Sequence, residues 1–369
     1  MSNIEIPVYQ PYLNGNEKKY VMDCMNTTWI SSKGSYITKF EDAFAKYTDS
    51  KYATTVNNGT TAIHLALLAI GIQPGDEIIV PSFTYVASVN MIVAAGAVPV
   101  FADSTLETWQ ISIDDVVRKI TSRTKAIMAV HLYGNCCNMD ILLDICNKNN
   151  LKLIEDCAEA FGTFYKNQHV GTFGDVATFS FFGNKTITTG EGGMVITQSQ
   201  EIYDELIHLK NQGVSKTKQY WHDVVAYNYR MTNIQAAIGL GQIEQIEEII
   251  SKKQIIAKYY QTHLAHLPLN TDPINDEVVN SYWMSSIVLD DSFKRDDLRA
   301  HLEQLGIETR PFFYPSHVLP MYEHLAKSTY PNAEKISASG INLPSFPSLN
   351  NDQLEYICVS IKEFFHAYE

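Results

Sequence analysis

The chain of 369 residues is poor in cysteine, and its six cysteines exclude two classes of protein. So few cysteines in a chain of this length do not form the disulfide framework of a small secreted scaffold. No two of them are spaced as CxxC, the pattern typical of zinc sites. We therefore expect free thiols, a reducing compartment and no metal ion.

Positive charge is also scarce: the chain has 28 lysines and arginines against 41 aspartates and glutamates, which gives a net charge of −13. Sequence-independent binding of nucleic acid depends on lysine and arginine that neutralise phosphates, so we expect no nucleic-acid partner. The sequence has no apolar run of membrane-spanning length and no basic, then apolar, start typical of a signal peptide. These absences predict a cytoplasmic protein without a membrane partner.

Internal repeats and low-complexity linkers are missing as well, and 45% of the residues are hydrophobic. This length exceeds what one hydrophobic core usually organises, so we expect two domains. We place a large domain at residues 1–250 and a small C-terminal domain at residues 251–369. Apolar residues at helical spacing over residues 238–264 predict a single helix that crosses from one domain to the other.

Short strand-like runs alternate with helical stretches in the large domain. They lie at residues 77–80, 97–102, 125–132, 152–156, 176–181 and 194–197. Strands that alternate with helices are typical of an α/β fold, in which catalytic groups lie at strand ends. We therefore expect the functional residues after these runs.

Three motifs lie at or just after the ends of the runs at residues 152–156 and 176–181. They are EDCAEAFG at residues 155–162, FSFFGNK at residues 179–185 and TGEGG at residues 189–193. Pyridoxal phosphate needs a lysine amine that forms a Schiff base with its aldehyde. It also needs a carboxylate that keeps its pyridine nitrogen protonated. Lys185 and Asp156 are the candidates for these roles, so the motifs predict a site for pyridoxal phosphate.

The same motifs resemble those of the DegT/DnrJ/EryC1/StrS family of sugar aminotransferases, and the likeness extends from residue 7 to about residue 347. The resemblance implies the aspartate aminotransferase-like, type I fold: a large domain with a mostly parallel central sheet, and a smaller C-terminal α/β domain. Family members that carry histidine in place of Lys185 are dehydratases. The lysine of this chain therefore implies transamination.

In a transaminase Lys185 serves twice, as the covalent attachment point and as the acid and base that moves a proton between the amino donor and the cofactor. A free lysine amine has a pKa of about 10.4, so desolvation or a nearby cation must lower it. Elimination or dehydration on the same cofactor is the alternative reaction. A cofactor-binding regulator is the non-enzymatic alternative.

Two segments are candidates for binding the cofactor phosphate. The run NNGTTA around Gly59 and Thr60 turns from a strand into a helix, where free backbone N–H groups bind anions. An ordinary helix capped by threonine is the alternative. The resemblance implies that Ser180 contributes a hydroxyl to the phosphate, and a buried serine bonded to the backbone is its alternative.

The resemblance also implies three further cofactor contacts. Tyr85 corresponds to an aromatic ring that stacks on the cofactor, although a core tyrosine fits the sequence as well. Glu159 corresponds to a residue that hydrogen-bonds the cofactor's ring hydroxyl, with a solvated acid at a helix start as the alternative. Asn228 corresponds to an asparagine that reaches the other subunit's cofactor phosphate, which implies a homodimer with shared active sites.

The resemblance implies a nucleotide-linked keto-sugar as substrate and L-glutamate as amino donor. Residues 183–193, Glu159 and residues 308–315 are most similar to family members that aminate GDP-4-keto-6-deoxymannose at C4 for a surface polysaccharide such as O-antigen. The alternative substrate is dTDP-4-keto-6-deoxyglucose. Chemistry alone does not distinguish C4 from C3 amination.

Four residues are weaker candidates for the substrate site. Arg230 lies two positions after Asn228, and the resemblance implies a place near the nucleotide sugar. The others, which would line the substrate entrance, are Arg310, Tyr314 and His317. Packing or plain surface exposure is the alternative for each of these three.

Overall fold

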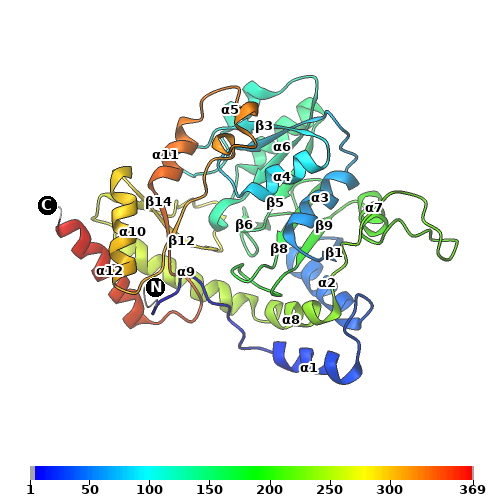
Figure 1. Cartoon of the computed structure of the whole chain (residues 1–369), viewed down its shortest axis with the longest axis horizontal. Coiled ribbons are helices and arrows are strands. Elements are labelled where there is room, and N and C mark those ends of the chain that lie inside the picture. Colours follow the sequence, from blue (N-terminus) through cyan, green and yellow to red (C-terminus); the bar gives the residue numbers. More distant parts are fainter. Residues whose placement is uncertain (1–4, 368–369) are drawn as a thin grey trace.

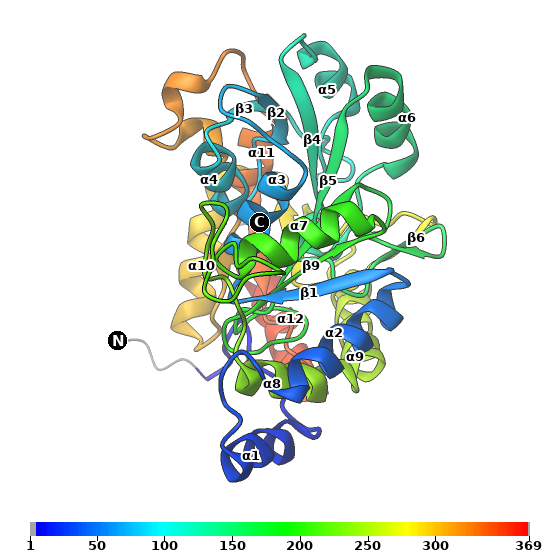
Figure 2. The same ribbon diagram turned by 90° about the vertical axis from the view of Figure 1, so that its right-hand side faces the viewer.

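The computed structural model describes residues 5–367, and a seven-stranded sheet forms its centre (Figures 1 and 2). The strands are ordered β1-β9-β8-β5-β4-β2-β3. Their bounds are β1 (Tyr52–Val56), β2 (Glu77–Pro81), β3 (Val98–Ala102), β4 (Thr124–Val130), β5 (Lys152–Asp156), β8 (Val176–Ser180) and β9 (Gly193–Thr197). β9 runs antiparallel to both of its neighbours, whereas the other pairs are parallel. The mostly parallel α/β fold is therefore confirmed.

Helices cover both faces of this sheet, which is why its strands are continuous apolar runs. On β2, Ile78 packs into one core cluster and Ile79 into the other, because successive side chains point to opposite faces. One face is covered by α3 (Gly59–Ala69), α4 (Val86–Ala94) and α7 (Gln200–Lys210). The other is covered by α2 (Ser35–Thr48), α5 (Ile113–Lys119), α6 (Met139–Asn149) and α8 (Asn233–Ile243), and α1 (Glu17–Thr27) packs on α8.

A second, antiparallel sheet with the order β10-β12-β14-β13 organises the C-terminal part. Its strands are β10 (Leu269–Thr271), β12 (Ser285–Leu289), β13 (Arg310–Pro311) and β14 (Gly340–Leu343). A third core cluster joins this sheet to α9 (Ile246–His263), α10 (Arg295–Gln304) and α12 (Asn351–His366). The helix α11 (Pro331–Ser339) packs instead into a core cluster of the large sheet.

The single helix predicted over residues 238–264 is wrong, because α8 ends at Ile243 and α9 begins at Ile246. At the break the N–H of Gln245 donates to the Gln242 carbonyl, a tighter turn than the α-helix makes. The side chain of Gln245 also donates to Glu17 of α1, at 3.0 Å. A contact with a distant helix therefore accompanies the break before α9, and the spacing of apolar residues does not predict such a contact.

The boundary between the large-sheet core and the small-sheet core lies within α9. Ile249 and Ile250 belong to a core cluster of the large sheet, whereas Ile256 and Tyr260 belong to that of the small sheet. We therefore propose the division into residues 1–250 and 251–369, with two segments that pack across it: α11, as described above, and the N-terminal segment. Ile6 also packs in the small-domain core, so the N-terminal segment crosses to it.

A small three-stranded sheet connects the two parts of the chain. It pairs β11 (Val278–Val279) with β6 (Phe164–Tyr165), and β6 with β7 (Gln168–His169). All six cysteines are free and buried, as expected. Between residues 5 and 367, no helix combines the length and apolar character needed to cross a membrane.

Candidate active site

Lys185 lies in the loop between β8 and β9, and its side chain is only 13% exposed. Its Nζ lies 3.9 Å from Oε1 of Glu159 and 4.1 Å from the centroid of the Trp283 ring. Burial lowers the pKa of Lys185, although the charges of Glu159 and Asp156 act in the opposite direction. The site therefore favours a neutral amine, the form that acts as nucleophile and base.

Two distant side chains fix the backbone at this lysine. The hydroxyl of Tyr9 donates to the carbonyl of Lys185 at 2.6 Å, and the indole N–H of Trp283 donates to the carbonyl of Asn184 at 2.7 Å. Tyr9 is 176 positions away in the sequence. Sequence reasoning missed both residues, because neither belongs to the motif that contains the lysine.

Asp156 ends β5, as predicted, and its side chain is 4% exposed. Oδ2 accepts a 2.7 Å hydrogen bond from Ser88 of α4, and Oδ1 accepts one of 3.1 Å from the N–H of Ala158. These bonds leave lone pairs of the carboxylate free for another partner. A buried, oriented carboxylate of this kind suits a cationic N–H group.

Glu159 is also 4% exposed, which rules out a solvated acid at a helix start. Its Oε2 accepts a hydrogen bond of 3.0 Å from the N–H of Tyr133. Burial raises the pKa of Glu159 to about 7, while Lys185 and the Tyr133 N–H act to lower it. At neutral pH the side chain can therefore both donate and accept hydrogen bonds.

The start of α3 touches the end of β8. A Cβ at Gly59 would lie 2.6 Å from Cβ of Ser180, so only glycine permits this approach. Thr60 is exposed, and Asn58, not a threonine, caps the helix by accepting a bond of 2.8 Å from the N–H of Thr61. The first turn of α3 and the hydroxyl of Ser180 thus lie side by side, as an anion site requires.

An aromatic wall surrounds this edge of the sheet. The ring of Tyr133 stacks on Phe312 at 4.5 Å, on Phe313 at 5.6 Å and on Trp283 at 6.0 Å between centroids. Tyr85, at the start of α4, contacts Phe313 at 5.4 Å and is 56% exposed. Tyr85 is therefore not a core tyrosine, and its ring is accessible to a ligand.

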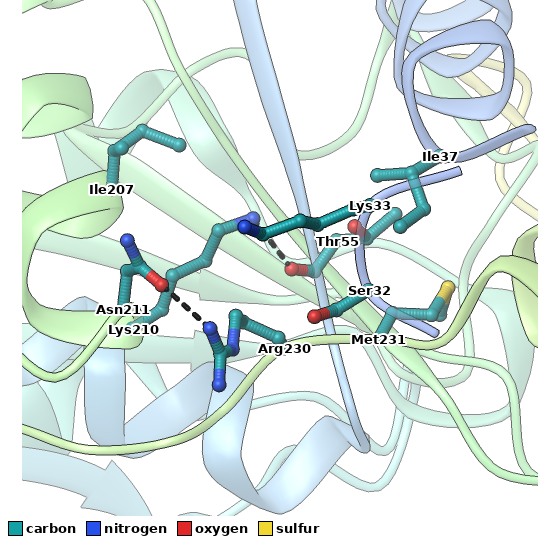
Figure 3. A pocket seen from close by; sticks show the side chains of 9 residues that line it. All are labelled: Ser32, Lys33, Ile37, Thr55, Ile207, Lys210, Asn211, Arg230 and Met231. Atoms are coloured by element: carbon teal, nitrogen blue, oxygen red, sulfur yellow. Dashed lines mark hydrogen bonds between the residues drawn. The ribbon is translucent and has the colours of Figure 1, made fainter. Parts of the chain in front are cut away.

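Arg230 lines a cavity of about 250 Å³ (Figure 3), and Asn228 is joined to this arginine by a hydrogen bond. Arg230 donates to the amide oxygens of Asn228 and Asn211, each at 2.9 Å. Asn228 is exposed, so a second chain could reach it. The cavity is lined by Ser32, Lys33, Ile37, Thr55, Ile207, Lys210, Asn211, Arg230 and Met231.

The three remaining substrate candidates differ in their surroundings. Arg310 is half-exposed and lies 3.6 Å from Glu308, and Tyr314 is exposed. His317 is buried, with Nδ1 hydrogen-bonded to Ser82 at 2.6 Å and Nε2 to Glu334 at 3.1 Å. Because both ring nitrogens are occupied within the chain, His317 matches the packing alternative.

His131, Glu155 and Cys157 are buried and lie close enough to hold a metal ion. Glu155, however, accepts hydrogen bonds from Nε2 of His131 at 3.1 Å and from the N–H groups of Gly171, Phe173 and Gly174. Nδ1 of His131 accepts a hydrogen bond from the N–H of Cys137, and burial raises the pKa of the Cys157 thiol. The donor atoms are thus used for structure, and we assign no metal there.

Comparison with known proteins places the chain among aminotransferases. The model of the DegT/DnrJ/EryC1/StrS aminotransferase family matches residues 11–362. The GDP-perosamine synthase of Escherichia coli O157:H7 is 56% identical over 360 residues, which are 98% of each chain. That of Vibrio cholerae is 56% identical over 365 residues, 98% of this chain and 100% of its own.

Solved structures agree with this placement. PseC of Helicobacter pylori, an aminotransferase involved in the biosynthesis of pseudoaminic acid, superposes with a TM-score of 0.93 at 26% identity, over 98% of this chain and 100% of its own. Spr1654 of Streptococcus pneumoniae in its PLP form superposes with a TM-score of 0.94 at 26% identity, over 99% of each chain. The chain belongs to the DegT/DnrJ/EryC1/StrS aminotransferase family.

Proposed function

We propose that the protein is a pyridoxal phosphate-dependent aminotransferase that moves the amino group of L-glutamate to C4 of GDP-4-keto-6-deoxy-D-mannose. The product would be GDP-perosamine, for a surface polysaccharide such as O-antigen. The observation that carries the choice of sugar is the 56% identity, over nearly the whole chain, to two GDP-perosamine synthases. Cytoplasmic location is part of the proposal, since all six cysteines are free thiols.

The residues of the site fit pyridoxal phosphate. Lys185 offers a desolvated amine, and Asp156 offers a buried carboxylate with free lone pairs. The buried amide oxygen of Asn184 and the hydroxyl of Thr186, which flank the lysine, have no hydrogen-bond partner within the described residues. Unsatisfied polar atoms at this position support a polar ligand beside Lys185.

We assign the remaining contacts by geometry. The first turn of α3, with Gly59 and Thr60, and the hydroxyl of Ser180 would hold the phosphate. Tyr85 would cover one face of the ring, and Glu159 would hydrogen-bond its hydroxyl group. When bound, the cofactor supplies an aldehyde that accepts the amino group and a protonated ring that withdraws electrons.

Lys185 has two tasks in this proposal: it holds the cofactor, and it moves a proton at the α-carbon of the amino donor. The second task requires a neutral amine, and the burial of Lys185 favours that form by lowering its pKa. Trp283 and Glu159, which lie about 4 Å from Nζ, keep the amine in position. The hydrogen bonds that the carbonyls of residues 184 and 185 accept restrain the loop that contains the lysine.

We further propose a homodimer with two shared active sites. Asn228 is exposed and Arg230 donates to its amide oxygen, which leaves the amide N–H groups of Asn228 available to donate to a partner's phosphate. Arg230 and the cations of the adjoining cavity would lie near the same anionic ligand.

The substrate is tested by steady-state kinetics with L-glutamate and each nucleotide sugar. We expect the higher kcat/KM with GDP-4-keto-6-deoxymannose, and a C4 amino sugar as the product by mass spectrometry and NMR. A clear preference for dTDP-4-keto-6-deoxyglucose would overturn the choice of substrate. Product formed without glutamate would instead indicate elimination, and no turnover with any keto-sugar would favour a regulator.

The cofactor is tested separately. Borohydride reduction of the purified protein, followed by peptide mass spectrometry, should find the cofactor attached to Lys185. The Lys185→Ala variant should show neither attachment nor turnover. Full transamination by Lys185→Ala would refute the mechanism.

A further inference from the structure

Lys253 of α9 has no exposed surface, which is rare for a lysine. Its Nζ donates a hydrogen bond of 2.8 Å to the carbonyl of Ser345 and lies 5.1 Å from the ring centroid of Tyr9. Among residues 5–367 no carboxylate charge affects its pKa, which burial lowers to about 7. A buried amine without a counter-charge costs stability, so packing alone does not account for it.

Lys253 lies where three parts of the chain meet. It lies between Ile250, which packs in the large-domain core, and Ile256, which packs in the small-domain core. Ser345 follows β14 of the small domain, and Tyr9 belongs to the N-terminal segment, which passes close to α9 (Figure 1). The ammonium group therefore joins both domains and the N-terminal segment.

A continuous series of contacts leads from this ammonium group to the active site. Ser345, whose carbonyl accepts from Lys253, donates its own N–H to the carbonyl of Val8 at 3.2 Å. The N–H of Val8 donates to Glu308 at 2.9 Å, which fixes this segment on the small domain. The next residue, Tyr9, donates its hydroxyl to the carbonyl of Lys185 at 2.6 Å.

We propose that Lys253 is a positioning residue for Lys185, which it holds in place through Ser345 and Tyr9. Its ammonium group contacts the Tyr9 ring and the Ser345 carbonyl, and Tyr9 in turn donates to the carbonyl of the active-site lysine. Without Lys253, the Tyr9 hydroxyl would move, and the amine of Lys185 would spend less time beside Glu159 and Trp283. The inference rests on the proposed function only for the role of Lys185.

The experiment compares four variants of the full-length protein. Lys253→Met removes the ammonium group but keeps a long apolar side chain, and Lys253→Arg keeps a cation and a donor. Tyr9→Phe removes only the hydroxyl. Lys258→Met is the matched control, because Lys258 is an exposed lysine of the same helix.

The main readout is the rate at which Lys185 of the cofactor-free protein becomes covalently attached to added pyridoxal phosphate, trapped by borohydride and quantified by peptide mass spectrometry. Lys253→Met and Tyr9→Phe should each slow attachment by about fivefold, the weight of one hydrogen bond. The double variant should be no slower than either single one, because both act on one contact series. Lys253→Arg should restore most of the rate, and Lys258→Met should match the wild type.

Thermal denaturation separates positioning from a general structural role. Lys253→Met should melt no earlier than the wild type, because it removes a buried amine without a counter-charge. Attachment at the wild-type rate in Lys253→Met, or additive losses in the double variant, would overturn the inference. If Lys253→Met does not fold, an unchanged rate in Tyr9→Phe overturns it equally. Failure of wild-type Lys185 to become attached would instead refute the proposed function.

Discussion

At the scale of single residues, burial controls the chemistry of the site more than ion pairing does. Glu159 and Lys185 are 3.9 Å apart, close enough to attract each other as ions. Burial nevertheless raises the pKa of Glu159 to about 7 and lowers that of Lys185. Both shifts favour the neutral forms of the two side chains.

The raised pKa of Glu159 predicts how the stability of the cofactor-free protein depends on pH. Its folded-state pKa of about 7 exceeds the ordinary value of 4.5, so the folded state binds more protons between these pH values. Glu159 thus contributes stability that is present below pH 4.5 and is lost as the pH rises through 7. Glu159→Gln should remove this loss, on the order of 2–3 kcal/mol.

Urea denaturation at pH 5 and pH 8 measures this difference in the free energy of unfolding. Glu355→Gln is the control, because Glu355 is exposed and should leave the dependence of the wild type unchanged. If Glu159→Gln loses as much stability as the wild type between the two pH values, Glu159 is not the group responsible.

A second residue-scale prediction concerns Asp156. Asp156→Asn can still accept a hydrogen bond from Ser88, so the fold and some bound cofactor should remain. It loses the charge that keeps the cofactor ring protonated, so kcat should fall by about 100-fold or more. Stopped-flow kinetics and visible absorbance measure the two effects. Ser88→Ala, which removes a hydrogen bond but no charge, should lose far less, and a kcat of Asp156→Asn within twofold of the wild type would argue against this role.

The residues that the sequence identified at the site are those with a local signal. Asp156 ends an apolar run, and Lys185 follows small and aromatic residues, so both were found from the motifs. Ser88, Tyr9 and Trp283 were not found, because only the folded chain brings them to these motifs. The burial of Glu159 also depends on the packing of distant residues and has no sequence signal.

At the scale of elements, the strands of the central sheet were predictable because both of their faces are buried. The run at residues 152–156 matches β5, and the others agree with the structure within two residues. The three-stranded sheet was missed, since strands of two residues are too short to show a period. The break between α8 and α9 was missed because Glu17, in a distant helix, holds it.

The contact between α3 and β8 supplies a prediction at this scale. Gly59→Ala would place a Cβ 2.6 Å from Ser180, so the first turn of α3 must move away from β8. The affinity for pyridoxal phosphate should fall by about tenfold, and the strain should cost about 1–3 kcal/mol of stability. Titration of the cofactor-free protein, followed by absorbance, measures the affinity.

Gly183→Ala is the matched control for this prediction, because a Cβ at residue 183 would meet no atom within 4 Å. It lies in the loop before Lys185 but should bind the cofactor nearly as well as the wild type. Equal affinity of the Gly59 and Gly183 variants would show that the first turn of α3 does not contact the phosphate.

At the scale of the whole molecule, the exposed position of Asn228 supports the proposal that a second chain completes the site. Trp29 and Ile30, which precede α2, expose large apolar side chains, and Trp29 accepts a hydrogen bond from Asn233 at the start of α8. Apolar surface of this kind is typical of an interface between subunits. A dimer with two-fold symmetry would exchange Asn228 in both directions.

Mixing two inactive variants tests this exchange. Lys185→Ala and Asn228→Ala subunits, once mixed in equal amounts and exchanged, should form mixed dimers with one intact site each. Because half of the dimers are mixed, the activity should return to about a quarter of the wild-type value. Mass spectrometry of the intact dimers verifies the exchange. Mixed dimers without activity would contradict a shared site.

The position of β1 at the edge of the sheet determines when the site can form during protein synthesis. Within the described sheet β1 pairs only with β9, and Tyr52 lies opposite Thr197. A ribosome that adds about 5–20 residues per second needs roughly 7–30 s to synthesise the residues between them. Throughout this interval β1 lacks a complete β9 with which to pair, and for most of it α3 has no β8 beside its first turn. The phosphate site is therefore assembled late, and until then the unpaired backbone groups of β1 can pair with another chain.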